Sequence, residues 1–267
     1  MKGSLHEVTA LRLTADSSAA LDDRVIVEAP VALLYNGESF AVMMATPEAL
    51  EDFALGFALG EGIVATPQEF RLVDVVPHEQ GVALHAAIPQ ARFDDLQQRR
   101  RGLEGRSGCG LCGVESLQAA LRDVPKVPST GVVPATRIHA ALADLARRQP
   151  LNALSGGVHA AAFAHAHGLL VREDVGRHNA LDKLIGAMAR YDAPLHAADG
   201  FALITSRASY EMVHKAATAG LGLLVAISAP TDLAIRTAES AGLTLAAFAR
   251  GGSLNVYSHP QRIDAGS

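Results

Sequence analysis

The chain has 267 residues, enough for one large domain or for a large domain with a smaller one, and either can bury a full core. Its content of 49% hydrophobic and 19% charged residues excludes a disordered or fibrous protein, and the net charge of -5 argues against a surface built for duplex DNA. No apolar run approaches the ~20 residues of a membrane span, and Glu7 and Arg12 interrupt the start where a secretory signal is apolar. We therefore expect a cytoplasmic protein that binds neither nucleic acid nor membranes.

The first part of the chain is predicted to be rich in strands. Two alternating segments meet at a turn at Asn36 and Gly37, a pair typical of a tight hairpin. A helix follows, with Thr46 as its expected cap and Gly60 as its end. A second hairpin is predicted to turn within residues 77–81.

The regular pattern fades between Pro89 and Pro134, where we expect a mobile loop. This stretch holds both cysteines, Cys109 and Cys112, in the segment GRSGCGLCG. Three uses of the pair stay open: a redox dithiol, a metal site shared across a dimer, or a nucleophilic thiolate on a flexible tether. The surrounding glycines and arginines favour the thiolate, because glycine frees the backbone and positive charge stabilises S⁻.

Helices and strands alternate regularly in the remainder of the chain. A helix over 136–148 precedes two strands, 158–165 and 169–175, and helix-strand repeats then continue to residue 249. The predicted fold is a layered α/β domain with a mixed sheet, residues 131–267, after a smaller strand-rich part, residues 1–130.

Polar and glycine-rich segments stand where the strands of the second part should end. Ligands of open α/β sheets gather at the carboxyl ends of strands, and helix N-termini there favour anions. The convergence of five such segments predicts one pocket for a phosphate-bearing ligand, although each residue alone fits a helix cap or a surface ion pair equally well. Its cationic or proton-donating side chains are His159, Arg177, His178, Arg207, Lys215 and Arg250, and its glycines are Gly156, Gly157, Gly176, Gly251 and Gly252.

Two common nucleotide-binding motifs are missing from these segments. The chain has neither the phosphate-loop signature of NTPases nor the glycine fingerprint of dinucleotide-binding oxidoreductases. Neither class of enzyme is therefore supported.

A series of longer motifs follows one order along the chain: NGE, FALGFALGEGI, GCGLCG, GGVHAAAF, EDVGRHNALDKLIG, SRASYEMVHKA, ISAPTDLA, GLTLAAFARGG and NVY. Together they resemble the formate dehydrogenase accessory sulfurtransferase family, FdhD, over about residues 25–257. The resemblance implies a fold similar to cytidine deaminase and a homodimer. The zinc signature of the deaminases is missing, because Ala160 and Ala161 follow His159, so deamination is rejected.

The resemblance also implies a function. A cysteine desulfurase would pass sulfur to Cys109 as a persulfide, and the protein would transfer it to the bis-molybdopterin guanine dinucleotide cofactor of formate dehydrogenase, with Cys112 assisting or dispensable. The pocket would be the guanine-dinucleotide site, with guanosine diphosphate as a mimic and no metal of the protein's own. Asp174 belongs to this implied site, and its binding loop is Phe248, Ala249, Arg250, Gly251, Gly252 and Ser253.

Two other functions stay open beside the sulfurtransferase. A non-catalytic chaperone would bind the molybdenum cofactor and deliver it, with the cysteines holding a metal or the dimer. A zinc-dependent hydrolase would contain stoichiometric zinc.

Overall fold

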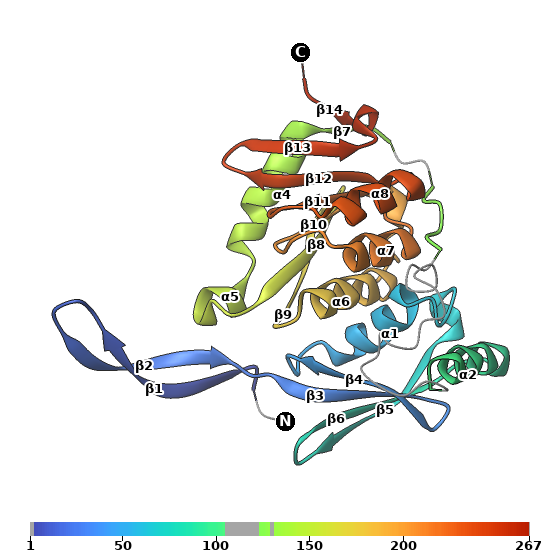
Figure 1. Cartoon of the computed structure of the whole chain (residues 1–267), viewed down its shortest axis with the longest axis horizontal. Coiled ribbons are helices and arrows are strands. Elements are labelled where there is room, and N and C mark those ends of the chain that lie inside the picture. The colour runs from blue at the N-terminus through green and yellow to red at the C-terminus, as the bar shows by residue number, and fades with distance from the viewer. Residues whose placement is uncertain (1–2, 105–122, 129–130, 267) are drawn as a thin grey trace.

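The computed structural model describes residues 3–104, 123–128 and 131–266. The chain forms a four-stranded sheet and a six-stranded sheet with helices between them (Figure 1). The predicted mixed α/β class is confirmed, whereas the likeness to cytidine deaminase and the boundary near residue 130 stay predictions. None of the described helices is both long and apolar enough to cross a membrane.

A two-stranded arm forms the N-terminus and projects from the body (Figure 1). It consists of β1 (Leu5–Leu13) and β2 (Ser18–Ile26), which pair antiparallel along their whole length. The sequence analysis did not predict this hairpin. Its residues are mostly exposed, Leu11 and Leu13 among them, so no alternation of buried and exposed positions marked it.

The four-stranded sheet contains both predicted hairpins, in the order β4-β3-β6-β5. Its strands are β3 (Ala29–Tyr35), β4 (Glu38–Ala45), β5 (Arg71–His78) and β6 (Gly81–Ala87). Asn36 and Gly37 both have positive φ, as the tight turn between β3 and β4 requires. Helix α1 (Leu50–Gly60) packs on this sheet, but it begins later than predicted, with Ala49 and not Thr46 at its N-cap.

Helix α2 (Gln90–Glu104) corrects the expectation that the chain becomes irregular after Pro89. Good helix formers such as Gln, Leu and Arg fill it, and its sequence has few large apolar residues to mark a stripe; of its described side chains, Phe93 and Leu96 pack on the N-terminal core. The loop expected around the two cysteines lies outside the described residues and stays a prediction.

The six-stranded sheet has the order β13-β12-β11-β10-β8-β9. Its strands are β8 (His159–His165), β9 (Gly168–Asp174), β10 (Phe201–Ile204), β11 (Leu223–Ala226), β12 (Thr244–Arg250) and β13 (Ser253–Ser258). The helices are α4 (Ala135–Arg147), α5 (Pro150–Ser155), α6 (Arg177–Ala189), α7 (Tyr210–Thr218) and α8 (Asp232–Ala241). The shorter elements are η1 (Pro67–Glu69), η2 (Ala197–Asp199), η3 (Pro260–Arg262), and β7 (Val133–Pro134) paired with β14 (Ile263–Asp264).

Strand direction places several chain ends on one edge of the six-stranded sheet. Strands β10, β11 and β12 are parallel, β8 is antiparallel to β10, and β9 is antiparallel to β8. The last residues of β9 to β12 and the first of β8 therefore lie together. We call this the carboxyl edge.

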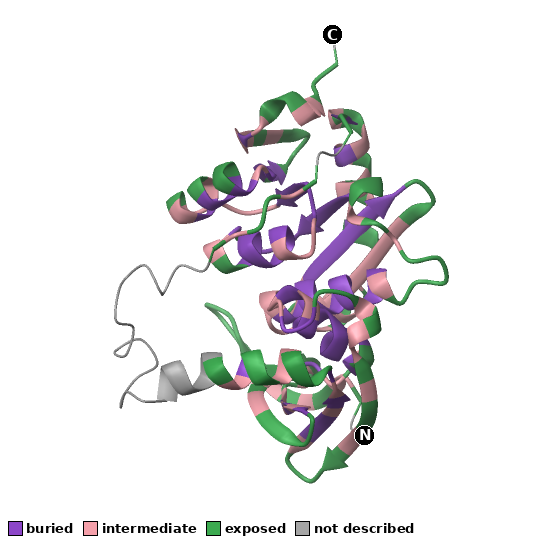
Figure 2. Cartoon of the chain, turned by 90° about the vertical axis from the view of Figure 1, so that its right-hand side faces the viewer, coloured by how far each residue is buried: buried purple, intermediate pink, exposed green. Residues whose placement is uncertain are grey.

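The helices cover both faces of the six-stranded sheet. Helices α6, α7 and α8 pack on one face through a shared apolar cluster, and α4 packs on the other face through a second cluster. Buried residues concentrate in this sheet and in the helices between the two sheets (Figure 2). The two sheets therefore share a middle layer in which α1 meets α6.

Two glycines allow α1 and α6 to touch backbone to backbone. A Cβ added to Gly56 would lie 1.6 Å from the Asp182 carbonyl oxygen, and one added to Gly186 would lie 1.9 Å from the Asp52 carbonyl oxygen. Real Cβ atoms do not approach so closely, so any larger residue must separate the helices.

We expect Gly186→Ala to lower the free energy of unfolding by about 3 kcal/mol or more, because the added methyl meets backbone that cannot move aside. Urea unfolding followed by circular dichroism measures the loss. Gly242→Ala is the control, since Gly242 ends α8 with φ 74° and open space around it, and it should lose only about 1 kcal/mol. Equal losses in the two variants would contradict the close helix contact.

Candidate functional site

The structure brings the predicted polar segments together at the carboxyl edge. The Thr205 amide donates to the Ala160 carbonyl at 3.0 Å, which joins the end of β10 to the start of β8. The Ala208 amide donates to the Ala229 carbonyl at 3.1 Å, beyond the ends of β10 and β11. Phe248 in turn donates its amide to the Ser228 carbonyl at 3.1 Å, so β12 completes a continuous row.

Two helices at this edge are not capped by the side chains of their N-cap residues. Gly176 and Ser209 hold the N-cap positions of α6 and α7, and neither offers a side-chain acceptor to its helix. In α8, by contrast, the Thr231 hydroxyl accepts the Ala234 amide at 3.2 Å. The first amides of α6, with the positive end of its helix dipole, can therefore bind an anion, whereas at the start of α7 the Glu211 carboxylate already accepts its own backbone amide.

Arg177 is the charged centre of this edge and lies at the first residue of α6. Burial lowers the pKa of His159, and the Arg177 guanidinium lowers it further. The pKa of His178 is lowered by burial and then by Arg177, while Glu211 opposes the shift from 3.5 Å away. The Arg177 Nε is buried and makes no hydrogen bond to any described residue. A bound anion would accept a hydrogen bond from this Nε, because buried donors are almost always paired.

The predicted binding loop forms the hairpin turn between β12 and β13. Gly251 and Gly252 have φ of 61° and 79°, and nothing stands within 4 Å of where their Cβ atoms would be. Their backbone angles therefore suit glycine even without a ligand. Phe248 is 36% exposed with φ 52°, next to a register shift in the β12–β13 pairing. Of the other loop residues Ala249 is buried, and Arg250 and Ser253 are exposed.

The segment with Gly156 and Gly157 is held to the sheet by Glu173. The Glu173 carboxylate accepts the Leu151 amide at 3.0 Å and the Asn152 amide at 2.8 Å, the first turn of α5. Gly156 then ends α5 with φ 63° and leads the chain to His159.

Arg207 is an exposed cation in the turn that follows β10. Its side chain is exposed, while Ser206 before it and Ala208 after it are buried. It is therefore available to a ligand without rearrangement of the turn.

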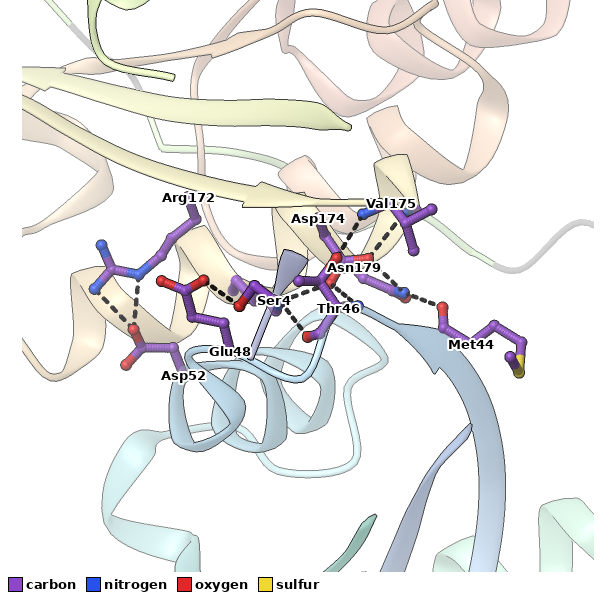
Figure 3. A network of polar contacts seen from close by, with 11 residues as sticks. Ser4, Met44, Thr46, Glu48, Asp52, Arg172, Asp174, Val175 and Asn179 are labelled. Carbon is purple, nitrogen blue, oxygen red and sulfur yellow. Dashed lines mark hydrogen bonds and ion pairs between the residues drawn. The ribbon is translucent and has the colours of Figure 1, made fainter. Parts of the chain in front are cut away.

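Asp174 ends β9 at the carboxyl edge, but its side-chain contacts are internal (Figure 3). It is fully buried; Oδ1 accepts the Gly176 amide at 2.8 Å and the Asn179 amide group at 3.1 Å, and Oδ2 lies 2.6 Å from Lys183 Nζ. The contacts that the structure gives this carboxylate support the turn that carries Arg177.

Lys215 is similarly enclosed. Its Nζ lies 2.8 Å from Asp182 Oδ1 and 2.8 Å from Glu61 Oε1, and its side chain is 7% exposed. Burial opposes its charge, but the two carboxylates outweigh burial and raise the pKa of Lys215. The ammonium group links α7 to α6 and to the end of α1, so a ligand role for it stays a prediction.

Sequence reasoning missed two residues around the site. Glu211 follows the N-cap of α7 and contacts His178, and its place in SYEM just after a predicted strand was the available signal. Thr46 was predicted as a helix cap, yet its side chain accepts a hydrogen bond from Val175, 129 residues away. No local pattern could have indicated that contact.

Two larger cavities lie away from the carboxyl edge. One of about 490 Å³ lies at the root of the arm, beside Pro30 and Pro77, and one of about 630 Å³ lies beside the C-terminal half of α6. The case for a site at the carboxyl edge therefore rests on its charged side chains and the N-terminus of α6, and not on either of these cavities. Cys109 and Cys112 lie outside the described residues.

Comparison with known proteins gives consistent matches. Residues 26–264 match the FdhD/NarQ family. The chain is 57% identical over 260 residues to the "Sulfur carrier protein FdhD" of Xanthomonas euvesicatoria pv. vesicatoria, covering 97% of this chain and 92% of that protein. It is 49% identical over 248 residues to the protein of the same name from Bordetella petrii, covering 92% and 88%.

A solved structure shares the fold. It is that of a putative formate dehydrogenase accessory protein from Desulfotalea psychrophila, with a TM-score of 0.76 and 23% sequence identity. The match covers 97% of this chain and 99% of that one, so the two folds correspond over nearly their whole length.

We expect Arg177→Gln to raise the pKa values of both His159 and His178, because the neutral side chain no longer disfavours a second positive charge nearby. NMR titration of the imidazole signals measures both values. Arg207→Gln is the matched control and should leave both pKa values unchanged. Titration curves that are the same in wild type and Arg177→Gln would show that the charge of Arg177 does not affect either histidine.

Proposed function

The chain belongs to the FdhD/NarQ family, and from this premise we propose that it carries sulfur for a formate dehydrogenase. It accepts the sulfur from a cysteine desulfurase as a persulfide and transfers it to the bis-molybdopterin guanine dinucleotide cofactor. It works as a homodimer in the cytoplasm.

The observation that carries this proposal is the match to relatives named as sulfur carriers over nearly the whole chain, 57% identical across 97% of it. The chain also contains the thiol chemistry that the role needs, since its only cysteines stand in the segment GCGLCG. A simple match of folds would carry much less, because one fold serves many functions.

Loading is a thiolate exchange at sulfur. The Cys109 thiolate attacks the terminal sulfur of the desulfurase persulfide, a new S–S bond forms on Cys109, and the desulfurase cysteine leaves as a thiolate. No net oxidation occurs, because one S–S bond replaces another. Glycines on both sides of Cys109 and after Cys112 suit a sulfur that must reach two proteins in turn.

The carboxyl edge is the proposed binding place for the cofactor, which is the substrate of the transfer. Its pyrophosphate would accept hydrogen bonds from Arg177, Arg207 and the first amides of α6. The exposed ring of Phe248 and the turn Arg250–Ser253 would flank the guanine end. His159 and His178, whose lowered pKa values favour the neutral imidazole, would donate hydrogen bonds without adding charge.

We expect Cys109→Ala to abolish persulfide loading and formate dehydrogenase activity in cells that depend on this protein, because no other residue replaces the thiolate. Cys112→Ala should be milder and serves as the matched control. Intact-mass analysis after incubation with a desulfurase and cysteine measures the loading. A loaded wild type with unloaded Cys109→Ala supports a carrier, whereas no loading of either protein favours the non-catalytic chaperone.

We expect Arg207→Ala to weaken guanosine diphosphate binding about ten- to a hundredfold, since a charge-assisted hydrogen bond contributes about 1.5 to 3 kcal/mol. Calorimetry measures binding, and adenosine diphosphate is the ligand control, expected to bind less tightly. Persulfide loading should be unchanged, because the desulfurase reaches Cys109 away from this edge. A variant that loads poorly but still binds the nucleotide would reverse the assignment of the two steps.

A further inference from the structure

Thr46 joins the four-stranded sheet to the turn that carries Arg177 and His178 (Figure 3). It is fully buried just after β4, and its hydroxyl accepts the Val175 amide at 3.2 Å. Its own amide donates to Asp174 Oδ2 at 3.1 Å, and its carbonyl accepts from Lys183 Nζ at 2.9 Å. Every polar group of this one residue is therefore bonded to the segment from β9 to α6.

A hydrogen bond between Asn179 and Met44 provides a second link between the two sheets beside Thr46. Asn179 Nδ2 donates to the Met44 carbonyl at 2.8 Å and to Asp174 Oδ1 at 3.1 Å. The turn from Val175 to His178 is thus attached at its start by Thr46 and at its end by Asn179. Its only polar side chains, Arg177 and His178, stand between these two attachments.

Within its own half of the protein the turn is held by Asp174, whose Oδ1 accepts the Gly176 amide at 2.8 Å. Glycine at position 176 has no side chain to pack, and a Cβ there would lie 2.8 Å from Asn179 Nδ2 and 3.4 Å from Asp174 Oδ1. The direction in which α6 presents its first residues therefore depends on Asp174 and on the contacts that Thr46 and Met44 make from the other sheet.

We propose that Thr46 is a positioning residue of the binding site at the carboxyl edge: its hydroxyl fixes the Val175 amide, and through it the places of Arg177 and His178. The inference rests on the proposed function, because it assumes that Arg177 holds the pyrophosphate. It assigns the four-stranded sheet a role in binding, although none of its residues stands at the carboxyl edge.

The test compares Thr46→Val, which keeps the shape but removes the acceptor, with Thr46→Ser, which keeps the hydroxyl. We expect Thr46→Val to bind inorganic pyrophosphate about three- to tenfold more weakly than wild type and Thr46→Ser to bind within about twofold. Thr46→Ala replaces Thr46→Val if the latter does not fold.

Arg190→Met is the matched control for stability. Arg190 binds Asp52 at 3.0 Å and also Glu51, so it bridges α6 and α1 at the far end of the same contact without touching the turn. It should lower the melting temperature without changing pyrophosphate binding. If Arg190→Met and Thr46→Val weaken pyrophosphate binding equally, Thr46 contributes only to stability and the proposal is overturned.

A second measurement reports on the turn itself. Burial is the first cause of the lowered pKa of His178, so a loosened turn should raise this pKa in Thr46→Val and not in Arg190→Met. An unchanged His178 pKa in Thr46→Val overturns the positioning role. If Arg177→Ala binds pyrophosphate as wild type does, the proposed binding site is wrong, but the His178 titration still decides whether Thr46 positions the turn.

Discussion

The contact between α1 and α6 is the constraint on which the rest of the structure depends. Each sheet packs its own apolar cluster, but the two sheets meet through these helices, where Gly56 and Gly186 leave no room for a side chain. Close approach of the backbones brings Asp52 to Arg172 and Arg190 at one end of the contact. It also brings Thr46, which lies four residues before α1, to Asp174, so a single helix crossing aligns several polar bridges between the described halves.

The buried charges at this crossing favour a specific arrangement more than they add stability. Asp174 and Lys183 are both fully buried, and Lys215 and Asp182 nearly so. Removing charges from water costs several kcal/mol for each ion, and the mutual attraction offsets this only when the geometry is good. Lys215 also pairs with Glu61 at the end of α1, and Arg172 pairs with Asp52 of α1, so a shifted crossing would break both contacts and leave partly buried charges unpaired. The ion pairs thus oppose any other register of α1 on α6.

The segment EDVGRHNALDK shows how a motif can combine scaffold and site. Glu173 holds the first turn of α5, Asp174 and Asn179 hold the β4–α1 connection, and Asp182 and Lys183 are paired inside the protein. Of its ionisable side chains, Arg177 and His178 remain to face a ligand. The motif's length reflects the number of elements that must be placed around those two residues.

The sequence by itself determined the alternation of strands and helices after residue 158, because buried strands and amphipathic helices leave a local periodicity. It also determined that polar segments follow β9 to β12, and that the strands must therefore bring them to one edge. It did not determine the exposed arm or α2, whose residues bury too little apolar surface to leave such a pattern. Only the tertiary structure decided that Thr46 bonds Val175 and that Lys215 lies between two carboxylates, because both contacts join residues brought together by the packing of α1 on α6 and α7.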